Sequence, residues 1–280
     1  MKQLIALKDL SIEDISSVFE IAESLEKGFQ EELKGKSFAL FFPESSIRTR
    51  VSYEIAIHSM GGNIINFPEN ALDKKEDVKD VVGYLENWVD GIILRNSDYN
   101  KIKYIAECSS KVVINAMSKE NHPCEILTDL YTFRKMRRDY RELTYLFIGP
   151  ATNIGRSYYH AAEKLGFQMI QSCPKGTEIA EESEIFHVNN LLDEVIGKAD
   201  IIITDGVEEK KEYFEKFQIT QKRVEKMKED ALLNLTPPFY RGSVISKELD
   251  LDRVKQFVGY EFKKNLLNVQ AAIILWCLKN

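Results

Sequence analysis

One short stretch in the first part of the chain gathers several side chains that bind anions. An apolar run at 37–42 predicts a strand and the pattern at 47–60 predicts a helix, with Ser46, Arg48 and Thr49 where the two meet. Such a turn leaves backbone N–H groups free at the helix N-terminus, where the helix dipole adds partial positive charge. Hydroxyl groups and a guanidinium at the same point complete a cradle for a small anion such as phosphate. A serine cap beside solvated arginines is the competing interpretation.

Spacing along this helix predicts which of its faces is buried. Ile47, Val51 and Ile55 lie four residues apart and therefore on one side. We expect that side to pack against the core. Arg48 and Thr49 then face away from it, towards the opening of the turn.

Two further side chains stand where a site is expected to open. Arg95 follows the apolar run 90–94, at the carboxyl end of a predicted strand, which is where parallel sheets carry their sites. His122 precedes Pro123, the first residue of a predicted helix. A helix N-terminus disfavours the protonated imidazole, so we expect a neutral histidine that donates one hydrogen bond to a carbonyl. Taken singly, a surface arginine and a structural histidine are the ordinary interpretations.

The elements that must position these groups alternate between strands and helices. The runs that predict strands are 37–42, 63–67, 90–94, 111–115, 143–149, 167–171, 199–204, 231–235 and 256–260. The runs that predict helices are 11–27, 47–60, 76–88, 98–109, 123–138, 154–165, 190–197, 208–217, 221–229 and 264–279. This alternation indicates an α/β protein with parallel sheets covered by helices on both faces. The long pattern at 123–138 has no strand beside it, and we place the junction of two domains inside or just after it.

Composition excludes several classes of function. The chain has 280 residues, 44% hydrophobic and 29% charged, with a net charge of −6 and a pI near 5.5. This acidic balance argues against nucleic acid as a partner, and no apolar run is long enough to span a membrane. The four cysteines have no paired spacing and the first residues do not resemble a signal peptide, so we expect a cytoplasmic protein with free thiols. No cluster has the spacing of metal ligands.

Two motifs carry a resemblance to a known family. Residues 46–50, Ser-Ile-Arg-Thr-Arg, are similar to the phosphate motif S-T-R-T-R, and residues 122–125, His-Pro-Cys-Glu, are similar to H-P-(C/T)-Q. Both belong to the aspartate/ornithine carbamoyltransferase family. The ending "NLLNVQAAIILWCL" resembles the last helix of that family, which returns to the first domain.

The resemblance implies a two-domain enzyme without metal or cofactor. Residues 1–135 with the helix 264–280 would bind carbamoyl phosphate, and residues 136–263 would bind an amino acid. The family resemblance also implies a homotrimer whose subunits share active sites. The partners are then carbamoyl phosphate and an amino-acid amine, with no nucleic acid and no membrane.

Individual roles follow from the same resemblance. Arg48, Arg95 and His122 would be catalytic, stabilising the oxyanion that forms when an uncharged amine attacks the carbamoyl carbon. The residues implied to bind carbamoyl phosphate are Ser46, Ile47, Arg48, Thr49, Arg95, His122, Glu125, Lys75 and Arg241. Lys75 resembles a lysine that aspartate-specific members lend to a neighbouring subunit.

The second substrate is predicted from the second half of the chain. The residues implied to bind the amino acid are Asn153, Arg156, Asp205, Leu235 and Thr236. If Asp205 holds an α-ammonium while Arg156 or Asn153 holds an α-carboxylate, the substrate is an amino acid. We expect one other than aspartate, with ornithine or a shorter or longer diamino acid favoured.

Departures from the family pattern leave alternatives open. Ile47 replaces the motif threonine, Glu125 replaces the motif glutamine, and the H-C-L-P motif is replaced by Asn-Leu-Thr-Pro at 234–237. Glu125 either weakens carbamoyl phosphate binding or changes which substrate is held, and crowding could protonate it. A catalytically silent member that acts as a binding or regulatory protein is therefore the alternative function. A nucleotide-dependent oxidoreductase is disfavoured because "GPATNIG" lacks G-x-G-x-x-G, and nothing specific supports a purely structural protein.

Overall fold

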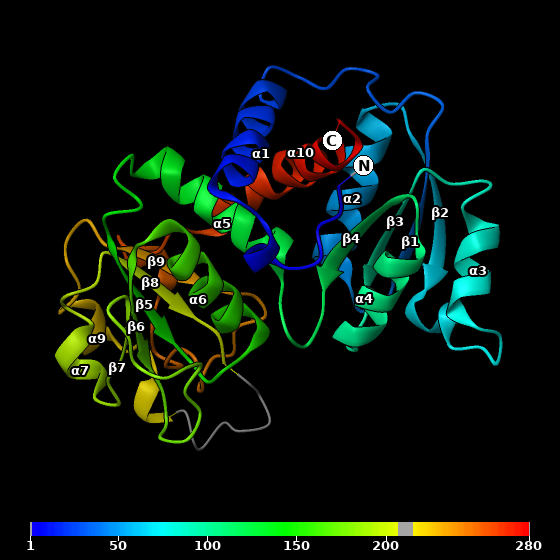
Figure 1. Cartoon of the computed structure of the whole chain (residues 1–280). Helices are drawn as coiled ribbons and strands as arrows, with labels where there is room; N and C mark the ends of the chain where they lie inside the picture. Colours follow the sequence, from blue (N-terminus) through cyan, green and yellow to red (C-terminus); the bar gives the residue numbers. More distant parts are fainter. Residues whose placement is uncertain (1, 207–214, 280) are drawn as a thin grey trace. The chain divides into compact units, whose positions relative to one another are not determined.

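The chain divides into two compact units. The computed structural model describes residues 2–206 and 215–279 (Figure 1). One unit comprises Met1–Thr132 with Lys263–Asn280, and the other comprises Phe133–Phe262. The sequence analysis predicted one domain of residues 1–135 with 264–280, and a second domain of residues 136–263.

The first unit is built on a four-stranded parallel sheet. Its strands are β1 (Ser37–Phe42), β2 (Asn63–Pro68), β3 (Gly91–Arg95) and β4 (Val112–Met117). They lie in the order β2-β1-β3-β4, and every neighbouring pair is parallel. β1, β3 and β4 are nearly continuous runs of buried apolar residues, as strands covered on both faces must be.

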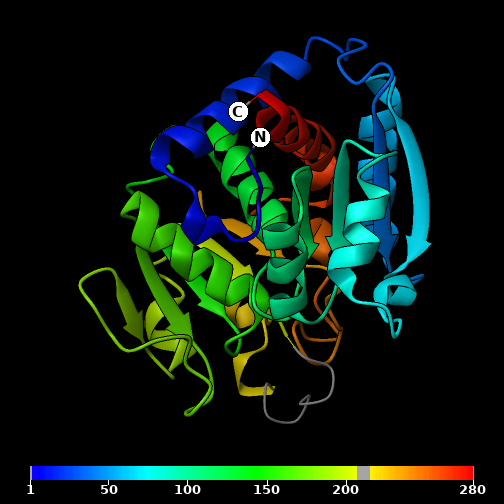
Figure 2. The same ribbon diagram turned by 45° about the vertical axis from the view of Figure 1, so that its right-hand side comes forward.

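Helices from both ends of the chain cover this sheet. They are α1 (Ile12–Leu25), α2 (Ile47–Ser59), α3 (Val78–Leu85), α4 (Tyr99–Cys108), α5 (Pro123–Met136) and α10 (Asn265–Lys279). α1 begins with a capping box between Ser11 and Asp14. α10 packs against α1, α2 and β4, and Figure 2 shows it beside α1. The last helix therefore completes the core of the first unit.

The second unit repeats the architecture with five strands. They are β5 (Thr144–Ile148), β6 (Gln168–Ser172), β7 (Phe186–Val188), β8 (Ile201–Thr204) and β9 (Leu232–Leu235), in the parallel order β7-β6-β5-β8-β9. The helices are α6 (Asn153–Leu165), α7 (Leu192–Val195) and α9 (Gln221–Val224). The main apolar cluster of this unit lies between the sheet and the segments that follow β8 and β9.

Each sheet has one point where the direction of strand addition reverses. In the first unit this point lies between β1 and β3, and in the second it lies between β5 and β8. The loops that leave two such strands diverge to opposite faces, which opens a crevice at their carboxyl ends. In the first unit Ser46 follows β1 and Arg95 is the last residue of β3. In the second unit Asn153 follows β5 and Asp205 follows β8. The topology alone thus places predicted site residues at both crevices.

Most predicted elements are confirmed, and the exceptions have local causes. Residues 256–260 form no strand, because only an isolated bridge joins Leu233 to Phe257. The strand β7 was not predicted, because its three residues are too few to show the alternation of a strand. The helix predicted at 221–229 ends at Val224. Most of the helix predicted at 208–217 lies outside the described residues.

The predicted buried face of α2 is wrong. Ile47, Val51 and Ile55 are 70%, 46% and 47% exposed. The buried residues of this helix are Thr49, Tyr53, Ala56 and Ile57. α2 carries apolar residues on two faces, and the face with Tyr53 is the one that packs, because α10 and the β1 residue Phe42 lie there.

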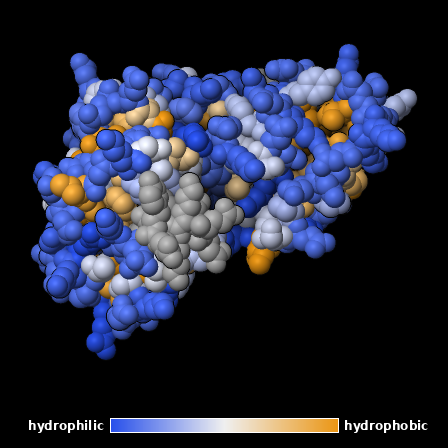
Figure 3. Space-filling view, turned by 90° about the horizontal axis from the view of Figure 1, so that it is seen from below, coloured by the Kyte–Doolittle hydropathy of each residue, from blue (hydrophilic) through white to orange (hydrophobic). Residues whose placement is uncertain are grey.

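One face of the molecule is dominated by polar side chains. On the side seen in Figure 3 hydrophilic residues prevail, and apolar residues form separate patches. Among residues 2–206 and 215–279, no helix has the length and apolar character needed to cross a membrane.

We predict that Gly149→Ala strongly destabilises the second unit. Gly149 has φ +154°, and a Cβ there would lie 2.1 Å from the carbonyl oxygen of Asp205 on the neighbouring loop. The clash should cost about 2 kcal/mol or more of unfolding free energy, measured by urea titration. Gly166→Ala is the matched control, since its φ is +82° but nothing lies within 4 Å of the added Cβ. It should cost about 1 kcal/mol. Equal losses for both variants would contradict a steric origin.

Candidate active site

A hydrogen bond joins the two loops at the crevice of the first unit. Nη1 of Arg95, at the end of β3, lies 3.2 Å from Oγ of Ser46, the N-cap of α2. Ser46 is 3% exposed, and Thr49 in the first turn of α2 is also buried. Arg48, between them, is exposed to solvent. Two hydroxyls, two guanidinium groups and a helix N-terminus therefore come from the segments that the sequence singled out.

The two arginines repel each other. Burial, followed by the nearby charge of Arg48, lowers the pKa of Arg95, while Glu69 and Glu125 partly offset this. Two guanidinium groups close enough to repel each other favour the binding of an anion, because an anion with two charges relieves the repulsion. Ser46 and the N-terminus of α2 add neutral donors to the same place.

His122 is neutral at physiological pH. It lies directly before α5 and is 6% exposed. Burial lowers its pKa from 6.5 to about 4; Glu125 opposes this shift, whereas Arg95 and Lys263 contribute to it. The neutral imidazole predicted from the sequence is thus confirmed, although burial rather than the helix dipole is the main cause. A neutral imidazole can donate one N–H to a carbonyl oxygen.

Glu125 is ionised, and a residue that the sequence did not reveal keeps it so. Nζ of Lys263 lies 2.7 Å from Oε1 of Glu125 and 2.5 Å from Oδ1 of Asp129. Burial acts to raise the pKa of Glu125, but the Lys263 ammonium outweighs this and lowers the pKa below its usual range. The alternative in which crowding protonates Glu125 is therefore wrong. One signal was present: Glu125 and Asp129 lie four residues apart, and two carboxylates on one buried helix face require a cation.

Cys124 is not a nucleophile of this site. Although it lies between His122 and Glu125 in sequence, its side chain is buried, and its Sγ is 3.0 Å from the hydroxyl of Tyr53. Burial raises the pKa of Cys124 to about 12. A thiol that stays protonated is unreactive, so its role is in packing.

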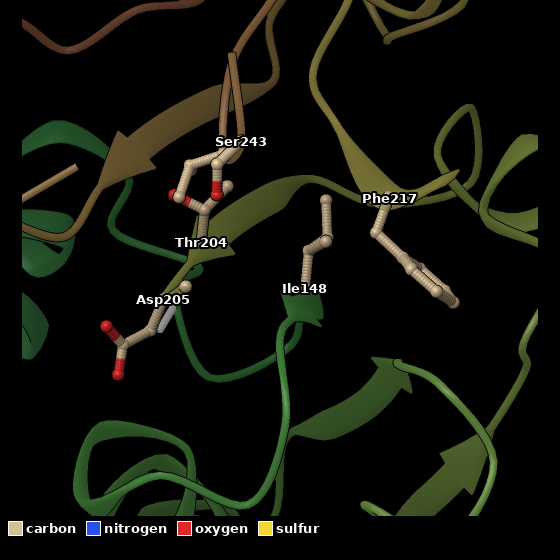
Figure 4. A pocket seen from close by; sticks show the side chains of 7 residues that line it. Ile148, Thr204, Asp205, Phe217 and Ser243 are labelled. Atoms are coloured by element: carbon tan, nitrogen blue, oxygen red, sulfur yellow. The ribbon is translucent and has the colours of Figure 1, made fainter. Parts of the chain in front are cut away.

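The second unit presents polar groups at its own crevice. Asp205 follows β8 and lines a small cavity of about 10 Å³ with Ile148, Thr204, Phe217 and Ser243 (Figure 4). Thr204 and Ser243 both line this cavity, and the Asp205 carboxylate points away from Phe217. The cavity has room for about one water molecule. It is therefore not itself the place of a substrate.

The other predicted residues of the second unit lie around the same strand ends. Asn153 begins α6, where its Oδ1 accepts a hydrogen bond from the N–H of Ile154 at 2.9 Å. Arg156 is partly exposed in the first turn of α6. Leu235 ends β9, and the N–H of Thr236 donates to the carbonyl of Thr204 at 3.1 Å. Backbone pairing of β9 with β8 thus places positions 235 and 236 at the same edge as Asp205.

Within the described part of the chain, three predicted residues make no contact that would place their side chains in the site of either unit. Ile47 exposes its side chain, so only its backbone N–H is available to an anion. Lys75 is exposed in the segment between the 3₁₀ helix Glu69–Leu72 and α3. Arg241 belongs to the second unit, where its Nη1 donates to the carbonyl of Leu249 at 2.9 Å.

The groups of the first unit suit a phosphate ester attached to a small amide. The arginines and hydroxyls match a phosphate dianion. Beside them, His122 can donate to a carbonyl oxygen and the ionised Glu125 can accept from an amide N–H. A planar group that carries both a carbonyl and an NH₂ would satisfy both side chains.

Comparison with family models finds a match for each half of the chain. Residues 2–135 match the model described as aspartate/ornithine carbamoyltransferase, carbamoyl-P binding domain. Residues 141–277 match aspartate/ornithine carbamoyltransferase, Asp/Orn binding domain.

Individual relatives match over their whole length. An ornithine carbamoyltransferase of Desulfotalea psychrophila is 30% identical over 297 residues, which cover 97% of each chain. The anabolic ornithine carbamoyltransferase of Campylobacter jejuni has a crystal structure with a TM-score of 0.89 and 28% identity, covering 100% of both chains. For that of Burkholderia thailandensis the TM-score is 0.90 and the identity 27%, over 99% of both chains.

We predict that His122 makes stability depend on pH. Its folded pKa of about 4 lies below the ordinary 6.5, so the unfolded chain binds a proton first as pH falls. The contribution of His122 to the free energy of unfolding is fully present above pH 6.5 and is lost as the pH falls towards 4. The loss is at most about 3 kcal/mol. Urea unfolding of the wild type and His122→Asn at pH 7 and pH 4 should show a smaller loss in the variant. Substitution of His58, which is exposed in the last turn of α2, is the control and should leave the loss unchanged. A variant that loses as much as the wild type would contradict the buried neutral imidazole.

Proposed function

This chain belongs to the aspartate/ornithine carbamoyltransferase family, as its two motifs predicted, and on that premise we propose that it carbamoylates an amino acid. The donor is carbamoyl phosphate and the acceptor is the amine of ornithine or a closely related diamino acid. The observation that carries the proposal is the hydrogen bond from Arg95 to Ser46 beside Arg48 and the neutral His122.

Phosphate binding is the best supported part of this proposal. Ser46, Thr49 and the backbone N–H groups at the start of α2 would hold the phosphate oxygens, with Arg48 and Arg95 neutralising their charge. Lys75 from a neighbouring subunit and Arg241 would add to the site, as the family resemblance implies. Ile47 contributes only its backbone.

The transfer itself needs positioning and charge stabilisation. The lone pair of the amine attacks the carbamoyl carbon and a C–N bond forms. The bond between this carbon and the bridging oxygen then breaks, and its electrons leave with the phosphate. The amine proton passes to the leaving phosphate or to solvent. His122 and Arg95 would stabilise the oxygen of the tetrahedral intermediate, and Arg48 would stabilise the departing phosphate. Holding both reactants in place contributes about 7 kcal/mol or more to such reactions in favourable cases.

The acceptor would be held by the strand ends of the second unit. Asp205 would bind the α-ammonium group, and Asn153 or Arg156 the α-carboxylate, with positions 235 and 236 lining the side chain. A carboxylate partner for the ammonium and a guanidinium partner for the carboxylate define an amino acid rather than a simple diamine. The relatives named above support ornithine as the first acceptor to test.

A second copy of the chain is the proposed partner, in a homotrimer. The exposed stripe of Ile47, Val51 and Ile55 begins inside the phosphate motif, and apolar residues so arranged are typical of an interface. Covering this stripe would bring a neighbouring subunit beside the phosphate site. The role proposed for Lys75 requires such a neighbour.

We predict that Arg48→Ala weakens carbamoyl phosphate binding by about 100-fold, because a charged hydrogen bond contributes about 3 kcal/mol. Arg50→Ala is the matched control, since the Nε of Arg50 lies 2.8 Å from Glu54 on the same helix. It should change affinity by less than about threefold. Calorimetric titration measures both, with release of phosphate on addition of ornithine as the test of turnover. Equal affinities for Arg48→Ala and wild type would overturn the phosphate cradle.

We also predict that Val51→Lys dissociates the assembly. The wild type should scatter light as three chains of 32.3 kDa and the variant as one. Ile12→Lys is the control, because Ile12 is 37% exposed on α1 and should tolerate the charge. A variant that keeps the wild-type mass would show that the stripe is not the subunit contact.

A further inference from the structure

A buried ion-pair cluster lies beside the proposed carbamoyl phosphate site. Nζ of Lys263 is 2.7 Å from Glu125 and 2.5 Å from Asp129. The two carboxylates are one turn apart on α5, and Lys263 lies just before α10, more than 130 residues away in sequence. The side chains of Asp129, Glu125 and Lys263 are 0%, 9% and 19% exposed. The fold therefore brings a distant cation to this helix face.

Stability alone does not account for such a cluster. Taking three charged groups out of water is costly, and packed apolar residues of similar size often stabilise a protein as well or better. What the cluster does provide is a carboxylate that stays ionised and fixed in direction within the proposed site.

The geometry defines what that carboxylate can do. Lys263 binds Oε1 of Glu125, so Oε2 keeps its capacity to accept a hydrogen bond from a ligand. A carbamoyl group offers an NH₂ next to its carbonyl oxygen, and His122 is suited to the oxygen. Without Lys263, the charge of Glu125 would repel the phosphate dianion that Arg48 and Arg95 attract.

We propose that Lys263 is a positioning residue: by holding Oε1 of Glu125 and Oδ1 of Asp129, it makes Glu125 an oriented acceptor for the carbamoyl N–H without repelling the phosphate. The inference rests on the proposed function. It explains how this chain carries glutamate where the resembling motif has glutamine, since the Lys263 ammonium offsets a charge that an amide would lack.

Substitutions of Lys263 separate this role from a purely structural one. Lys263→Met should weaken carbamoyl phosphate binding by about 10- to 100-fold and lower kcat, because Glu125 loses its partner. Lys263→Arg should keep most of both. Adding Glu125→Gln to Lys263→Met should restore the affinity to within about threefold of the wild type, since the amide accepts the same N–H without a charge.

The matched control changes the other carboxylate. Lys263→Met with Asp129→Asn removes the same charge from the same helix face, so it should recover stability to urea as the first double variant does. It should not recover carbamoyl phosphate binding or kcat, because Glu125 remains unpaired. A structural role for Lys263 predicts that the two double variants behave alike.

The outcomes distinguish this inference from the proposed function. If the wild type neither binds carbamoyl phosphate nor releases phosphate with ornithine or other diamino acids, the proposed function fails and the inference fails with it. If the wild type is active and Lys263→Met binds and turns over equally well, or if both double variants recover alike, only the inference is overturned. Recovery confined to the Glu125→Gln double variant supports it.

Discussion

The placement of two guanidinium groups, Arg48 and Arg95, near each other is the constraint on which the proposed phosphate site depends. Burial and, after it, the charge of Arg48 lower the pKa of Arg95. Ser46 accepts from Arg95 and fixes its direction. Beside them, burial keeps His122 neutral, and the Lys263 ammonium keeps Glu125 ionised. We propose that an anion would find its counter-charges already in place there, so that it could bind without reorganising the protein.

The same topological device serves both units, with different chemistry. Each parallel sheet reverses its strand order once, and the loops at that point carry the polar residues. In the first unit these loops carry the cations that we propose bind a phosphate. In the second, Asp205 lies so close to Gly149 that a side chain at position 149 would collide with its backbone. Loop sequence, rather than sheet architecture, therefore determines what each crevice binds.

The sequence predicted the elements well and the contacts between them less well. Buried strands such as β1 and β3 are continuous apolar runs bounded by turns, so their position and type follow from local pattern. The packed face of α2 could not be predicted, because Ile47 and Tyr53 lie on opposite apolar faces and only the arrival of α10 decides between them. Lys263 was missed for the same reason. Its partner lies 138 residues away, and no local pattern reports a pairing at that separation.

The return of α10 to the first unit has a consequence for synthesis on the ribosome. Residues 133–262 form one continuous unit, whereas the first unit needs both Met1–Thr132 and Lys263–Asn280. The nascent chain can complete the second unit while α1 and α2 still lack the helix that packs against them. Lys263 is synthesised after the whole second unit, so Glu125 and Asp129 lack this partner until translation has passed residue 262. The ion-pair cluster beside the proposed site is thereby completed only after the second unit has been translated, and a product that ends before residue 263 would lack it.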